Sequence, residues 1–171
     1  NGRVRVSSAK NAVLPIIAAT LLASTPSKLL EIPNLEDVGT ISQVIESLGV
    51  KITRNEADDE IIFDASMLTA TEAPYELVRK MRASFLVMGP LLARKGEAKI
   101  SMPGGCAIGA RPIDLHLKAF EALGAKIEIT EDYVYAHAPE GLTGTQIYLD
   151  FPSVGATENV IMAASMAKGK T

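Results

Sequence analysis

The segment between Pro103 and Pro112 carries the only cysteine of the chain within a glycine-rich stretch. Three glycines among six consecutive residues allow the backbone to approach a ligand closely. Arg111 follows Cys106 by five residues and directly precedes Pro112, which is a favoured first residue of a helix. A cation beside a helix start binds anions and favours the thiolate form of a nearby cysteine. The segment therefore predicts an anion site with a reactive thiol, and the alternative is a surface loop with an incidental cysteine.

Two more cations stand at unusual places in the sequence. Lys10 and Asn11 follow a predicted strand at Val4–Val6 and begin a helix that is predicted to enter the core. Lysine is rare at such a place, so Lys10 indicates either an anion contact or a first-turn side chain that extends to water. Arg82 interrupts an apolar helical pattern, where an unpaired charge is costly. For Arg82 we expect either a structural ion pair or a ligand contact.

Metal and cofactor chemistry lack support in the sequence. His116 and His137 belong to no cluster with metal-ligand spacing, so we expect a structural or solvated role for both. The sequence contains neither a Walker loop nor a dinucleotide-binding fingerprint. We therefore expect no metal and no cofactor.

The composition is typical of a single globular domain, with 171 residues of which 47% are hydrophobic and 22% are charged. The net charge of −3 gives no indication of a nucleic-acid or membrane partner. No apolar run reaches the roughly 18 residues that predict a membrane-spanning helix. A lone cysteine forms no internal disulfide, which favours a reducing compartment. Both ends of the chain resemble interrupted elements, so we expect a fragment of a longer protein.

The sequence repeats a unit of helix, strand, helix, strand and strand, which is its strongest architectural signal. The run Leu48-Gly49-Val50-Lys51-Ile52 is similar to Leu123-Gly124-Ala125-Lys126-Ile127, and in both runs glycine ends an amphipathic helical pattern. The second copy is longer because it contains the segment 103–112. A third copy is expected to begin near residue 146. The predicted strands are Leu29–Ile32, Val50–Arg54, Glu60–Asp64, Lys99–Met102, Ala125–Thr130, Tyr133–Ala138 and Gln146–Asp150, and a helix is expected at Gly155–Ala167.

Hydrophobic periodicity predicts which layer of the fold is buried. Helical patterns at Ala12–Ala23, Leu77–Ala93 and Val160–Ala167 are apolar on nearly every face, which indicates helices buried all round. The predicted strands alternate between apolar and polar residues, which indicates sheets with one hydrated face. The helices expected at Asp37–Leu48 and Pro112–Leu123 are two-faced and should lie nearer the surface. We therefore predict an α+β (mixed α/β) fold, one domain over residues 1–171, with helices inside and sheets outside.

Five motifs in order make this sequence similar to a known family. The chain resembles the UDP-N-acetylglucosamine enolpyruvyl transferases, or 1-carboxyvinyltransferases, over essentially its whole length. The resemblance implies an inside-out α/β barrel domain of repeated βαβαββ units, in a protein whose second domain is absent from this chain. The motifs are Ser8-Ala9-Lys10-Asn11-Ala12, Lys80-Met81-Arg82-Ala83-Ser84, residues 103–112, Asp114-Leu115-His116 and Ser153-Val154-Gly155-Ala156-Thr157.

The resemblance also implies a reaction. In this family the enolpyruvyl group of phosphoenolpyruvate moves to the 3′-hydroxyl of UDP-N-acetylglucosamine with release of phosphate, the first committed step of peptidoglycan synthesis in the bacterial cytoplasm. The substrates lie in the cleft between the two domains. The family's catalytic aspartate and a further arginine correspond to positions beyond Thr171, so the chain alone is expected to be inactive.

The resemblance assigns roles to particular residues. Cys106 corresponds to the cysteine that protonates the methylene of phosphoenolpyruvate or forms an adduct with it, and that the epoxide antibiotic fosfomycin alkylates. Lys10 and Arg111 correspond to cations that hold phosphoenolpyruvate, with Arg82 close by, and all three are expected to face one cleft. Asn11 corresponds to an amide that orients both substrates. The uridine pocket corresponds to Arg111, Pro112, Ile113, Asp114 and Leu115, and the turn beside the diphosphate to Ser153, Val154 and Gly155. Some members carry lysine in place of Phe151, so one possible contact with the diphosphate is missing here.

Two alternatives remain open. The 3-phosphoshikimate 1-carboxyvinyltransferases share the fold and reaction type, but their sites do not rely on a cysteine in this segment, so Cys106 favours the nucleotide-sugar enzymes. The other alternative is a non-catalytic protein that binds nucleotide sugars. The presence of Lys10, Arg82, Cys106 and Arg111 argues against it for the complete protein.

Overall fold

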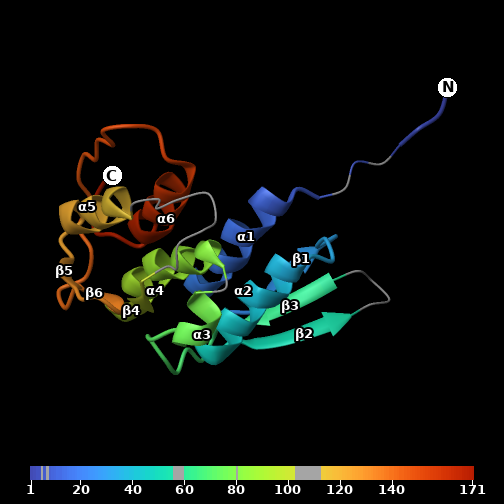
Figure 1. Ribbon diagram of the computed structural model, residues 1–171, viewed down its shortest axis with the longest axis horizontal. Helices are drawn as coiled ribbons and strands as arrows, with labels where there is room; N and C mark the ends of the chain where they lie inside the picture. The colour runs from blue at the N-terminus through green and yellow to red at the C-terminus, as the bar shows by residue number, and fades with distance from the viewer. Residues whose placement is uncertain (5, 7, 56–59, 80, 103–112) are drawn as a thin grey trace.

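A computed structural model describes residues 1–4, 6, 8–55, 60–79, 81–102 and 113–171, and for Arg82 it describes the backbone alone. Two antiparallel sheets of three strands each occupy different parts of the molecule (Figure 1). The strand order is β1-β3-β2 in the first sheet and β4-β6-β5 in the second, so the two sheets have the same topology. The strands are β1 (Ser27–Leu30), β2 (Lys51–Asn55), β3 (Glu60–Asp64), β4 (Glu97–Ser101), β5 (Lys126–Ile129) and β6 (Tyr133–His137).

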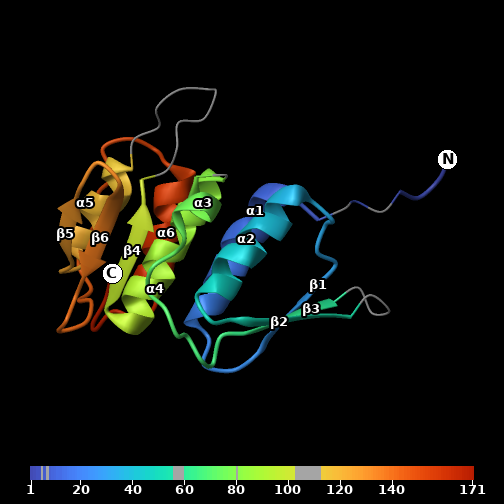
Figure 2. The same cartoon turned by 60° about the horizontal axis from the view of Figure 1, so that its bottom comes forward.

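The helices lie on the inner side of both sheets. In Figure 2, α4 and α6 stand between the second sheet and the pair formed by α1 and α2. This arrangement confirms the predicted α+β fold with helices inside and sheets outside. The helical elements are α1 (Lys10–Ala19), the 3₁₀ helix η1 (Thr20–Leu22), α2 (Glu36–Ser47), α3 (Tyr75–Val78), the 3₁₀ helix η2 (Arg82–Val87), α4 (Met88–Lys95), α5 (Asp114–Ala122) and α6 (Val154–Ala164).

The repeated Leu-Gly motif has the same conformation in both copies. Gly49 ends α2 with a φ of 101°, and Gly124 ends α5 with a φ of 96°, a region that residues with a Cβ rarely adopt. The amide of Val50 donates to the carbonyl of Ile45 at 3.2 Å, and Ala125 donates to Phe120 at 3.0 Å, so both helix ends close in the same way. The equivalence confirms the predicted repeat of helix, strand, helix, strand and strand.

Each sheet has one face toward the helices, as the alternating pattern predicts. On β4 and β6, Ile100 pairs with Val134 and both are fully buried. Lys99, which precedes Ile100 on β4, lies on the other face, where its Nζ is 3.0 Å from a carboxylate oxygen of Glu72. The buried side chains of both sheets join a core that is continuous with the helices.

Two of the helices predicted to be buried all round are only partly covered. Ile16 on α1 is 49% exposed and Ile161 on α6 is 63% exposed. The prediction of complete burial is therefore wrong for these helices among the described residues, because no described element packs against these faces. The third such pattern, residues 77–93, divides into α3, η2 and α4, since Met81 adopts an extended backbone conformation (φ −145°, ψ 122°).

Two expected strands are also absent from the part of the chain that the structure describes. The described residues of Val4–Val6 and of Gln146–Asp150 form no regular strand. A strand requires a neighbour to satisfy its backbone hydrogen bonds, and neither segment has one among the described residues. The α6 helix expected after the second of these segments is present. No helix among the described residues has the length and apolar character to cross a membrane.

Candidate functional site

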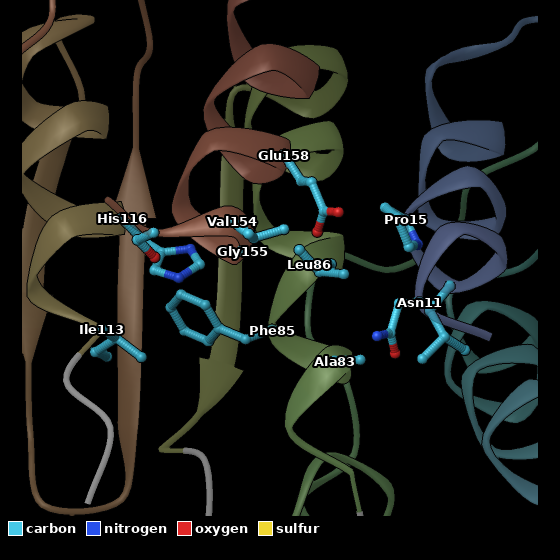
Figure 3. Close-up of a pocket in the computed structure, with 12 residues that line it drawn as sticks. Asn11, Pro15, Ala83, Phe85, Leu86, Ile113, His116, Val154, Gly155 and Glu158 are labelled. Carbon is cyan, nitrogen blue, oxygen red and sulfur yellow. The ribbon is translucent and has the colours of Figure 1, made fainter. Parts of the chain in front are cut away.

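A cavity of about 520 Å³ opens where α1, η2, the start of α5 and the start of α6 meet (Figure 3). Its wall is mainly apolar, with a small number of polar side chains, as is common in ligand pockets. The lining residues are Asn11, Leu14, Pro15, Ala83, Phe85, Leu86, Ile113, His116, Ser153, Val154, Gly155 and Glu158.

Five of the residues assigned to substrate binding line this cavity, and they come from three distant segments. Asn11 lies in the first turn of α1, and Ile113 is the residue before α5. Ser153, Val154 and Gly155 form the start of α6. Figure 3 shows Asn11 across the cavity from Val154 and Gly155. The fold thus brings these three motifs to one place.

The beginning of α6 presents a favourable site for an anion. Ser153 caps the helix, because its Oγ accepts a hydrogen bond from the amide of Ala156 at 3.3 Å. The first amides of an α-helix have no acceptor within the helix and carry a partial positive charge. The segment before this helix is tied to α5, since Nζ of Lys118 lies 2.6 Å from Oδ2 of Asp150. A phosphate oxygen at this end of the cavity would therefore meet positioned donors.

Lys10 does not line the cavity, although it precedes Asn11. Its ammonium group forms an ion pair with the carboxylate of Asp37 on α2. Two other described residues assigned to the uridine pocket also lie outside the lining: Asp114 begins α5 with an exposed side chain, and Leu115 is buried. Phe151 is exposed.

Of the residues predicted to take part in the reaction, Lys10 and Asn11 are described, but others are not. Cys106, Arg111 and Pro112 are outside the described residues, and so is the side chain of Arg82. The expected convergence of Lys10, Arg82 and Arg111 on one cleft therefore stays a prediction. Among the described residues, no group of three or more histidine, cysteine, aspartate or glutamate side chains is placed to hold a metal ion.

Three polar residues of this region were not among the predicted site residues. Glu158 lines the cavity, and burial raises the pKa of its carboxyl above the ordinary value of 4.5. His116, expected to be structural or solvated, is buried and forms part of the cavity wall. Asn159 is fully buried behind it and binds its ring at 3.1 Å. Glu158 and Asn159 are adjacent polar residues within the apolar pattern of α6, and this was the signal in the sequence that could have identified them. His137, by contrast, stacks on Tyr135 with ring centres 5.3 Å apart.

The whole chain, residues 1–171, matches the family model described as EPSP synthase (3-phosphoshikimate 1-carboxyvinyltransferase). The chain belongs to this family. Two solved structures support the same fold. The enolpyruvyl transferase NikO from Streptomyces tendae aligns with a TM-score of 0.81 at 22% identity, covering 99% of this chain and 39% of that one. EPSP synthase from Acinetobacter baumannii aligns with a TM-score of 0.73 at 19% identity, covering 98% and 39%.

The sequence comparisons confirm the resemblance to the nucleotide-sugar branch. The chain is 61% identical over 170 residues to UDP-N-acetylglucosamine 1-carboxyvinyltransferase 2 of Carboxydothermus hydrogenoformans, covering 99% of this chain and 40% of that protein. It is 58% identical over 171 residues to UDP-N-acetylglucosamine 1-carboxyvinyltransferase 1 of Staphylococcus aureus, covering 99% and 41%. The chain thus spans about 40% of the length of these relatives.

Proposed function

We propose that this chain forms one side of the active site of an enzyme that transfers the enolpyruvyl group of phosphoenolpyruvate to the 3′-hydroxyl of UDP-N-acetylglucosamine. The observation that carries the proposal is the meeting of Asn11, Ile113 and the start of α6 at one cavity. The relatives that share 58–61% of its residues bear the name of this activity, which supports the same assignment.

The described wall suits the nucleotide sugar. The diphosphate lies at the start of α6, where the first amides and the capped turn at Ser153 favour negative charge. Asn11, on the opposite wall, carries both a donor and an acceptor and is suited to orient sugar hydroxyls. The apolar residues around Phe85 exclude water, which strengthens these contacts.

The reacting groups come from the neighbouring motifs. Cys106 delivers a proton to the methylene carbon of phosphoenolpyruvate while the sugar hydroxyl adds to its central carbon. Protonation turns the methylene into a methyl group, and loss of phosphate and of one methyl proton from the tetrahedral intermediate restores the double bond. Arg82 and Arg111 hold the multiply charged phosphoenolpyruvate, and Lys10 joins them when it exchanges Asp37 for the substrate. The base that receives the hydroxyl proton belongs to the second domain.

The reaction places the protein in peptidoglycan synthesis in the bacterial cytoplasm, and hence in cell-wall growth, cell shape and cell division. Both substrates are small molecules, and the other partner of this chain is the second domain of the same protein. The single cysteine fits a reducing compartment.

Release of phosphate from phosphoenolpyruvate tests the proposal in the full-length protein that carries this chain. We expect release to require UDP-N-acetylglucosamine. We expect no release with 3-phosphoshikimate, which is the substrate of the alternative family members. Release with 3-phosphoshikimate alone would replace the proposal with that alternative. Tight binding of the nucleotide sugar without any phosphate release would indicate a non-catalytic binding protein.

A further inference from the structure

Glu158 places an acidic side chain in the cavity wall, and the proposed reaction does not use it. It is partly buried and lies about one helical turn beyond the start of α6. In Figure 3 its carboxyl group points away from α6 toward α1, which carries Asn11 and Pro15. Among the residues that the structure describes, this carboxyl group has neither a hydrogen-bond partner nor an ion-pair partner. A group partly removed from water thus lacks the partner that would offset the cost of its burial.

The helix that carries Glu158 is anchored by the next residue, Asn159, which is fully buried. The Oδ1 of Asn159 accepts a hydrogen bond from the amide of Gly89 at 2.8 Å, and its Nδ2 donates to the carbonyl of Phe85 at 3.0 Å. The same Nδ2 lies 3.1 Å from Nδ1 of His116. These contacts join α6 to α4, η2 and α5. The backbone at Glu158 is therefore held in place while its side chain faces the cavity.

The fold gains nothing from a carboxyl group at position 158. Burial raises the pKa of this carboxyl, because removal from water disfavours its charged form. A neutral side chain of the same size would avoid this cost. Groups that lower stability in this way are typical of binding sites, where a ligand supplies the missing partner.

The layout of the cavity indicates which part of the ligand meets Glu158. The proposed function places the diphosphate at the start of α6 and the sugar beside Asn11. A phosphate oxygen and a carboxylate repel each other, so the diphosphate is a poor partner for Glu158. The sugar lies on the side of the cavity toward which the carboxyl group points (Figure 3). Its hydroxyl groups and its acetamido N–H are donors, which is the chemistry that a carboxylate oxygen accepts.

We propose that Glu158 is a specificity-determining residue for the sugar, whose carboxylate accepts a hydrogen bond from an O–H or N–H group of the bound N-acetylglucosamine unit, across the cavity from Asn11. The identity of this ligand rests on the proposed function. A site built to accept a hydrogen bond discriminates against a ligand that lacks the donor. Glu158 therefore favours the nucleotide sugar over the bare nucleotide.

Isothermal titration calorimetry of the full-length protein without phosphoenolpyruvate tests the proposal, with UDP-N-acetylglucosamine and UDP as the two ligands. Glu158→Gln keeps the shape of the side chain and removes its charge. We expect this variant to bind the nucleotide sugar about tenfold more weakly, the scale of a hydrogen bond to a charged group. Its affinity for UDP, which has no sugar, should stay within about twofold or increase. Glu121→Gln, exposed on α5, is the matched control and should bind both ligands as wild type does.

A purely structural role of Glu158 predicts a different pattern. In that case Glu158→Gln would lower the melting temperature of the ligand-free protein and weaken the binding of both ligands alike. The proposal predicts a melting temperature at least as high as that of wild type, together with a selective loss of affinity for the nucleotide sugar. Unchanged affinity for the nucleotide sugar, or an equal loss for both ligands, would overturn the proposal.

These outcomes are distinct from those that test the proposed function. Selective loss of nucleotide-sugar affinity in Glu158→Gln, in a protein whose wild type releases no phosphate, would support the role of Glu158 and overturn the proposed transfer reaction. Phosphate release by the wild type, with unchanged nucleotide-sugar binding in Glu158→Gln, would overturn the role of Glu158 alone. A wild-type protein that binds no nucleotide sugar would overturn both.

Discussion

Glu158 places a carboxyl group in a cavity that we propose to hold two anionic substrates. The side chain lies on α6 one turn after Gly155 and points toward Asn11 and Pro15 in Figure 3. Burial raises the pKa of its carboxyl, because removal from water disfavours the charged form. A carboxylate at this place repels phosphate groups, so we expect it to contact a hydroxyl or amide group of the proposed nucleotide sugar.

The raised pKa of Glu158 predicts a pH-dependent effect on stability. Below the ordinary carboxyl pKa the group is protonated in the folded and unfolded states, so it causes no penalty. As the pH rises through the higher pKa of the folded state, ionisation costs the folded state more. Glu158→Gln should therefore raise the melting temperature relative to wild type at pH 7 and have less effect at pH 4. The corresponding gain in the free energy of unfolding at pH 7 should stay below about 0.5 kcal/mol, because the side chain is still partly hydrated. A larger gain at pH 4 than at pH 7 would contradict the sign.

Cys106 is predicted to be the reactive group of the full-length protein. From their places in the sequence, we expect Arg111 and the following helix start to favour its thiolate, so fosfomycin should alkylate it, and faster with the nucleotide sugar bound. Cys106→Ser should abolish the adduct. Cys106→Asp should keep an acid that protonates carbon but does not open the epoxide, so turnover should persist with resistance. Mass spectrometry of the protein provides the measurement, and near-normal turnover of Cys106→Ala would show that the thiol has no catalytic role.

At the scale of the elements, the sequence predicted the features that depend on local signals better than those that depend on long-range packing. The glycines at positions 49 and 124 gave the ends of α2 and α5, because a left-handed residue stops a helix wherever it occurs. The alternation around Ile100 gave the hydrated and buried faces of the second sheet. The division of residues 77–93 into three helical pieces, and the contact between α4 and α6, depend on tertiary packing that the periodicity does not contain.

The contact between α4 and α6 predicts a strong effect of one methyl group. A Cβ at Gly89 would lie 2.4 Å from both the backbone oxygen and the Oδ1 of Asn159, and it would break the hydrogen bond that this residue accepts. Gly89→Ala should lower the free energy of unfolding by roughly 2 kcal/mol or more. The control is Gly39→Ala within α2, where nothing lies within 4 Å of the added Cβ. That variant should stabilise by about 0.5–1 kcal/mol, as alanine is the better helix former. Denaturant unfolding of both proteins is the measurement, and equal effects would refute the packing argument.

For the whole molecule, the sequence predicted the repeat and the inner position of the helices, and it also grouped the motifs that line the cavity. It did not predict that α1 and α6 expose Ile16 and Ile161 among the described residues, because an apolar pattern does not reveal which neighbours are present. It also missed Asn159, whose role depends on three partners from three different elements.

The proposed function requires groups that this chain does not supply, which predicts its behaviour in isolation. The 171-residue chain contains the acid and several cations, but the proposed base belongs to the second domain. Removal of general acid–base help alone lowers rates by about 10² to 10⁴-fold. The isolated chain should release no phosphate from phosphoenolpyruvate above background. Turnover on the order of 1 per second by this chain would show that its own residues complete the site.

The identity of the product is the most direct test of the proposed reaction. Full-length protein is incubated with phosphoenolpyruvate and UDP-N-acetylglucosamine, and the nucleotide fraction is analysed by mass spectrometry and proton NMR. The account predicts a product that is heavier than the acceptor by C₃H₂O₂, with two vinylic protons and an ether bond at the 3′-oxygen, formed in equal amount to the phosphate released. An unmodified nucleotide sugar after prolonged incubation, or phosphate release without this product, would contradict the account.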